Sequence, residues 1–106
     1  MWIFFNDAFL SVVAHKTLPD SLLVRARADN DIEAVFPHAI VSHTPDHDYA
    51  YRTILSRNEV AEAIWDRALQ IDYPNFKGSI RQEDRNDIYF DVWRDMFEFQ
   101  RRREGP

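Results

Sequence analysis

The sequence contains no cysteine and only two glycines, and each shortage excludes a class of chemistry. Without cysteine there is no disulfide, no thiolate nucleophile and no zinc–thiolate site, and the composition suits a reducing compartment. Two glycines cannot form the glycine-rich loop that cradles phosphates in nucleotide-binding proteins. None of the five serines has the flanking glycines of a nucleophile elbow. We therefore predict no catalytic residue and no cofactor, and we expect a protein that is not an enzyme.

Long apolar runs are also missing. No stretch approaches the ~20 apolar residues that cross a bilayer, so we expect no membrane partner. The apolar start of the chain, residues 1–5, is too short for a signal peptide and lacks a basic region. These features predict a cytoplasmic protein.

Lysine is nearly absent, with Lys16 and Lys77 alone, so 11 of the 13 positive charges are arginine. Arginine makes planar, bidentate contacts and is favoured at interfaces. The formal net charge is −5, which argues against direct nucleic-acid binding because neutralising phosphates drives most of that affinity. The charge balance therefore favours a protein partner.

Large apolar residues are plentiful, with eight Phe, four Tyr and three Trp in a chain that is 45% hydrophobic. A chain of 106 residues buries a core without metal or disulfide support. We predict a single α+β domain that covers residues 1–106.

Alternating apolar and polar residues predict about five strands. Residues 2–5 and 8–15 form a hairpin around Asn6-Asp7, and further strands are expected at 22–28, 39–43 and 49–55.

Three helices are expected at 29–36, after Ser56, and at 84–102. Asn30 with Glu33, and Ser56 with Glu59, have the spacing of capping boxes. The second helix carries a regular stripe that we expect to face the core: Val60, Ala61, Ile64, Trp65, Ala68, Leu69 and Ile71. The order ββ-β-α-β-β-α-α predicts an α+β fold in which helices pack on one face of a mainly antiparallel sheet.

The last predicted helix has two opposed faces at about 100° per residue. An acidic row is formed by Asp84, Asp87, Asp91, Asp95 and Glu98. An apolar stripe is formed by Tyr89, Val92, Trp93, Met96 and Phe99. We expect the stripe to pack on the core and the acidic row to face water.

The acidic row supports our first hypothesis, a non-catalytic module that binds another protein through this helix. Carboxylates at i and i+4 rise ~6 Å, close to the spacing of phosphates along one nucleic-acid strand. The most specific version is an inhibitor that mimics nucleic acid and occupies a groove of a nucleic-acid-handling complex, as some phage-encoded inhibitors of host defence do.

Two further classes stay open. Arg25, Arg27 and Arg52 point to one sheet face if their strands are neighbours, and that face would bind nucleic acid or a small anion. His38, His43 and His47 lie close together in sequence and suggest a hydrolase with a loop metal site, although Thr44-Pro45 prevents helical geometry. The composition also leaves a homodimer open, because Trp2, Leu23 and Phe90 have no assigned place in a single core.

Asp72 to Lys77 has two interpretations. In the favoured one Tyr73 and Phe76 fill the core while Asn75 bonds backbone, and in the other Tyr73, Asn75 and Lys77 form a recognition surface.

Five segments carry a resemblance: residues 1–13, 22–27, 48–52, 71–77 and 89–93. Together they resemble a group of small uncharacterised bacterial proteins of similar length, in which Asp-Tyr-x-Asn-Phe-Lys is the most specific segment. The resemblance implies a cytosolic bacterial domain and no particular activity. The chain departs from the group at Asn86-Asp87-Ile88, where the group often has a histidine-containing segment.

Overall fold

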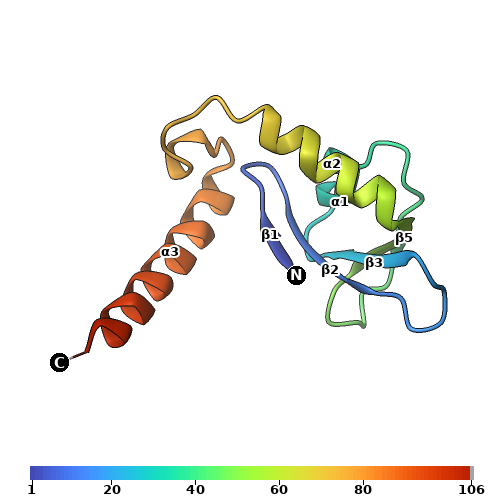
Figure 1. Cartoon of the computed structure of the whole chain (residues 1–106), viewed down its shortest axis with the longest axis horizontal. Helices are drawn as coiled ribbons and strands as arrows, with labels where there is room; N and C mark the ends of the chain where they lie inside the picture. Colours follow the sequence, from blue (N-terminus) through green and yellow to red (C-terminus); the bar gives the residue numbers. More distant parts are fainter. Residues whose placement is uncertain (106) are drawn as a thin grey trace. The chain divides into compact units, whose positions relative to one another are not determined.

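The five strands form one antiparallel sheet in the order β1-β2-β3-β5-β4 (Figure 1). The computed structural model describes residues 1–105. The strands are β1 (Trp2–Phe4), β2 (Phe9–Ala14), β3 (Ser21–Ala26), β4 (Ser42–His43) and β5 (Tyr51–Ser56). The helices within the described residues are α1 (Asp31–Val35), α2 (Arg57–Leu69) and α3 (Glu83–Glu104), with a 3-10 turn, η1 (Lys77–Ser79). The predicted α+β class and element order are therefore confirmed.

The chain divides into two compact units, Met1–Asp72 and Tyr73–Pro106. The first unit contains the whole sheet with α1 and α2, and the second contains η1 and α3. That the chain behaves as a single domain stays a prediction.

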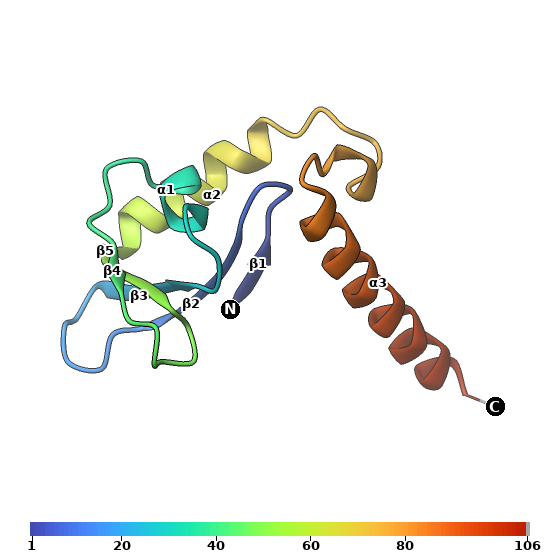
Figure 2. The same ribbon diagram turned by 180° about the vertical axis from the view of Figure 1, so that it is seen from behind.

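In the first unit α1 and α2 cover the same side of the sheet (Figure 1 and Figure 2). Alternate residues of β2, β3 and β5 point into this layer because the side-chain period of a strand is two. The buried core consists of Ala8, Leu10, Val12, Val24, Ala26, Ile32, Val35, Phe36, Leu55 and Val60. The intervening residues of the same strands, among them Ser11, Arg25 and Arg52, share the other face, which we call the outer face.

Two local predictions are confirmed. The β1–β2 hairpin turns at Asn6-Asp7, where the Phe5 N–H donates to the Ala8 carbonyl at 2.8 Å. The Ser56–Glu59 capping box opens α2, because the Glu59 N–H donates to Ser56 Oγ at 3.1 Å and the Ser56 N–H donates to Glu59 Oε1 at 3.4 Å.

The predicted Asn30–Glu33 capping box is wrong. Asn30 has φ 67°, a left-handed conformation that asparagine tolerates, and its side chain makes no cap hydrogen bond. Asp31 takes a different role: its carboxylate is buried and accepts the Phe9 N–H at 3.0 Å. A long-range contact to β2 therefore anchors the start of α1 in place of a local cap.

The predicted core stripe of α2 is right only for its first turns. Val60 is buried and Ile64 is half-buried, whereas Trp65, Leu69 and Ile71 are 64%, 67% and 56% exposed. Periodicity showed which residues share a helix face, but the sheet covers only the part of that face nearest β5.

In the second unit the loop before α3 folds back on the first turns of the helix. The Phe76 ring stacks on Tyr89 with centroids 5.8 Å apart, and Asn86 Nδ2 donates to the Lys77 carbonyl at 2.8 Å. Ile80 and Tyr89 are buried. The predicted continuous C-terminal helix is confirmed, with bounds slightly wider than 84–102. No helix within residues 1–105 has both the length and the apolar character needed to span a membrane.

Candidate functional site

The acidic row lies along α3 as the spacing predicts, and all five carboxylates are exposed. Asp91 accepts from Arg94 at 3.1 Å and Glu98 lies 3.8 Å from Arg101, so two members have exposed partners one turn away. The carboxylates of Asp87 and Asp95 make no hydrogen bond or ion pair within the described chain. The row is therefore only partly neutralised.

The apolar stripe opposite the row differs from expectation. Tyr89 is buried and Val92 is half-buried, but Trp93, Met96 and Phe99 are 47%, 58% and 51% exposed. Within the second unit, only the start of the stripe is therefore buried. The physical reason is that the loop before α3 covers only the first turns of the helix, where Phe76 stacks on Tyr89 and the Lys77 ammonium lies 4.0 Å from the centre of the Trp93 ring.

A second aromatic line runs beside the stripe. Phe90, Trp93 and Phe97 stack in sequence, with ring centroids 5.7 Å and 5.5 Å apart, and all three rings are exposed by more than two fifths. At ~200 Å² per large side chain, the six exposed apolar side chains of α3 together expose roughly 600 Å²: Ile88, Phe90, Trp93, Met96, Phe97 and Phe99. The largest single apolar patch on a typical monomer is about 300–600 Å². The exposed apolar surface of α3 is thus larger than the predicted stripe.

Residues 73–77 lie in the second unit and follow the favoured interpretation only in part, because Tyr73 and Phe76 are half-buried and lie outside the buried core. Phe76 packs on Tyr89, and Asn75 Oδ1 accepts the Gly78 N–H at 3.3 Å. Tyr73 lies 6.1 Å from Phe76, ring centre to ring centre. The segment shapes the loop that covers the start of α3. Asn86 lies in the segment where the sequence differs from the group that it resembles, and its side chain donates a hydrogen bond to the Lys77 carbonyl of this loop.

Arg25 has a different neighbour in each of the other two arginines of the alternative anion site: Arg52 by strand register and Arg27 by a shared contact with the Tyr49 ring. Arg25 and Arg52 are direct cross-strand partners on the outer face of β3 and β5. Arg27 lies two residues beyond Arg25, just past the end of β3, where it donates to the Asp48 carbonyl at 2.8 Å and to the Asp48 carboxylate at 3.3 Å. The structure therefore brings Arg25 and Arg52 together and gives Arg27 a carboxylate partner of its own.

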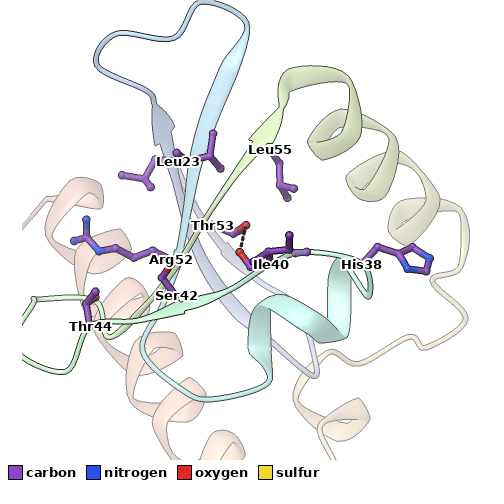
Figure 3. A pocket seen from close by; sticks show the side chains of 10 residues that line it. Leu23, His38, Ile40, Ser42, Thr44, Arg52, Thr53 and Leu55 are labelled. Carbon is purple, nitrogen blue, oxygen red and sulfur yellow. Dashed lines mark hydrogen bonds between the residues drawn. The ribbon is translucent and has the colours of Figure 1, made fainter.

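A groove of about 670 Å³ begins at Arg52 and passes around the edge of β5 beyond the end of β4 (Figure 3). Arg52, Ser42 and Thr44 lie at one end and His38 lies at the other. The remaining lining is mostly apolar: Leu23, Ala39, Ile40, Thr53, Ile54 and Leu55. Ile40 is 89% exposed, although its backbone carbonyl accepts a hydrogen bond from the Thr53 hydroxyl at 2.9 Å.

The histidines do not assemble. His43 stacks on Tyr51 with ring centroids 4.7 Å apart, as expected for the registered pair β4–β5. No three His, Asp or Glu side chains among residues 1–105 lie close enough together to hold a metal ion. A hydrolase with a loop metal site stays a prediction from the sequence.

Two neighbours of the arginine pair were missed from the sequence. Ser11 Oγ accepts from the Arg25 guanidinium at 2.9 Å, and the Tyr49 ring lies 4.4 Å from it. Alternation in residues 9–14 already puts Ser11 on one face, but only the β2–β3 register places it opposite Arg25. Tyr49 was predicted to belong to a strand and instead precedes β5, with its ring against Arg25 and Arg27.

These features define the protein as an α+β chain with an amphipathic, exposed C-terminal helix and an arginine pair on its sheet. Comparisons with protein-family models, with curated proteins and with solved structures gave no match.

Proposed function

We propose that the protein is a non-catalytic protein-binding module whose recognition element is α3. One observation carries the proposal: both opposed faces of this 22-residue helix, apolar and acidic, are exposed along most of its length. Exposed apolar surface of this size marks an interaction site in most proteins.

The two faces together define the chemistry of the partner. An amphipathic helix binds by laying its apolar face into a groove, so the partner needs an elongated apolar floor. Asp87 and Asp95, which have no bond within the described chain, then face basic residues at the rim of the groove. Charge pairs at a rim steer association and set specificity more than they add affinity.

Elongated grooves rimmed by Arg and Lys are the form of surface that binds nucleic acid. The finer proposal is therefore an inhibitor that occupies such a groove in a nucleic-acid-handling complex. The i, i+4 carboxylates of α3 supply negative charges at a repeat of ~6 Å, close to that of a phosphate backbone.

The test begins with affinity capture from the native host and identification of the captured protein. The purified partner is then titrated with wild type and with Asp87→Lys/Asp91→Lys over a salt series. The expected result is at least about tenfold weaker binding by the variant, because the charge at the rim is reversed. A matched control is Glu62→Lys/Asp66→Lys, which reverses two exposed charges at the same spacing on α2.

The apolar face has its own pair of variants. Met96→Ser/Phe99→Ser is expected to abolish binding, whereas Trp65→Ser/Leu69→Ser removes comparably exposed residues from α2 and leaves binding intact. Nucleic acid is expected to compete with the chain for the partner.

Three results contradict the proposal. Unchanged binding by Asp87→Lys/Asp91→Lys removes the acidic row from the interface. An equal loss of affinity in the Glu62→Lys/Asp66→Lys control shows that the effect comes from net charge and not from the acidic row. A wild-type dimer in sedimentation that Met96→Ser/Phe99→Ser dissociates assigns the apolar face to a second copy of this chain.

A further inference from the structure

The outer face of the sheet places two like charges directly opposite each other. Arg25 of β3 and Arg52 of β5 are registered partners, and partners in an antiparallel pair point to the same face. Like charges in this position destabilise a sheet. The row continues across the neighbouring strands, where Ser11 pairs with Arg25 and Ser42 pairs with Arg52.

Neither guanidinium has a carboxylate. Arg25 contacts the Ser11 hydroxyl and the Tyr49 ring, while the Arg52 side chain has no hydrogen bond or ion pair within residues 1–105. The Nε atoms of both residues are buried and make no hydrogen bond. Buried donors without a partner cost free energy, so both Nε atoms destabilise this face of the sheet.

A shortage of acids does not explain the unpaired arginines. Residues 1–72 contain eleven Asp or Glu and only six Lys or Arg. The same unit pairs Arg27 with Asp48 at 3.3 Å and Arg67 with Asp7 at 2.7 Å. Carboxylates are available, yet none lies at the arginine pair.

The surroundings of Arg52 indicate what occupies the site. Arg52, Ser42 and Thr44 form the polar end of the groove, and Leu23, Ile40 and Ile54 line its apolar part (Figure 3). Guanidinium groups bind phosphate and carboxylate oxygens in a planar, bidentate geometry. An oxyanion at the arginine pair would therefore have apolar surface directly beside it.

We propose that Arg25 and Arg52 bind the oxyanion head of a small ligand whose apolar chain lies in the groove. The shared chemistry is an alkyl oxyanion, either a phosphate monoester or a carboxylate. A single head group fits better than a nucleic acid, because the excess of acids in residues 1–72 repels a polyanion. The site belongs to the first unit and does not depend on the proposed function of α3.

In the test, the full chain is titrated with hexyl phosphate, hexanoate and inorganic phosphate, and calorimetry measures the affinity for each probe. Hexyl phosphate, hexanoate or both are expected to bind more tightly than inorganic phosphate. Arg25→Gln and Arg52→Gln are each expected to weaken binding at least about tenfold, since each removes a bidentate donor. The matched control is Arg57→Gln, which removes an exposed arginine whose side chain has no bond within the described residues.

A second measurement separates a binding role from a structural one. Without ligand, Arg52→Gln is expected to unfold at the same or a higher urea concentration than wild type, because the variant relieves the like-charge pair. Addition of the bound probe is expected to raise the midpoint of wild type but not that of Arg52→Gln.

The inference is overturned if neither alkyl probe binds, or if Arg57→Gln weakens binding as much as Arg52→Gln. Equal affinity for inorganic phosphate and the alkyl probes overturns the apolar part of the site. An unliganded Arg52→Gln that is clearly less stable than wild type assigns the pair a structural role. A single-stranded oligonucleotide that binds more tightly than both alkyl probes, and loses affinity in the same variants, replaces the small ligand with nucleic acid.

Discussion

Asp31→Ala should strongly destabilise the protein although α1 is a short helix. Asp31 is 3% exposed, and its carboxylate accepts the Phe9 N–H at 3.0 Å, which joins the first turn of α1 to the start of β2. A hydrogen bond to a charged group contributes about 1.5–3 kcal/mol, and an acid in the first turn of a helix adds about 0.3–1 kcal/mol. We expect the free energy of unfolding to fall by about 3 kcal/mol, a large part of the ~5–15 kcal/mol typical of a folded domain.

Equilibrium unfolding in urea, followed by far-UV circular dichroism, measures this loss. With a slope of about 1–1.5 kcal/mol per M for a small protein, the midpoint should fall by roughly 2–3 M. Asp31→Asn keeps an acceptor for Phe9 and should lose about half as much. Glu33→Ala removes an exposed acid from the same helix and should cost less than about 0.5 kcal/mol. A loss below 0.5 kcal/mol for Asp31→Ala, or an equal loss for Glu33→Ala, would refute the role of this carboxylate.

Two further predictions concern local anchors. Ser56→Ala breaks the capping box of α2 and should lower the free energy of unfolding by about 1 kcal/mol in the same urea assay. Ser56→Asn keeps a capping side chain and should lose much less. Equal stability of wild type and both variants would contradict the role of the cap. Phe76→Ala removes the ring stacked on Tyr89 and should speed amide hydrogen exchange at Gly78 and Ser79. Phe99→Ala, at a half-exposed position, should leave this exchange unchanged. Unchanged exchange in Phe76→Ala would show that other contacts hold the loop.

The strands, the hairpin turn and the long helices could be predicted because their causes are local. Alternation over 22–28 sets the faces of β3, a two-residue turn joins β1 to β2, and Ser56 with Glu59 starts α2 wherever the helix packs. The acidic row of α3 is likewise a consequence of helical spacing alone.

Local patterns do not determine which face of an element is covered. A stripe of large apolar residues usually marks a buried face. Within the second unit, however, the loop packs only on the first turns of α3, as far as Trp93, and leaves Met96 and Phe99 uncovered. The same limit applies to Trp65 on α2 and to the start of α1, where a contact between residues far apart in sequence replaced the expected cap.

What the sequence determined by itself was the set of elements, their faces and the α+β class, because these depend on propensity and periodicity over a few residues. Tertiary structure alone decided the strand register that places Arg25 opposite Arg52. It also decided that Asp48 pairs with Arg27, while Arg25 and Arg52 have no carboxylate partner, and how far α3 is exposed. The reason is that strand pairing and burial depend on contacts between segments far apart in the sequence, and the free energy of such a contact depends on both segments.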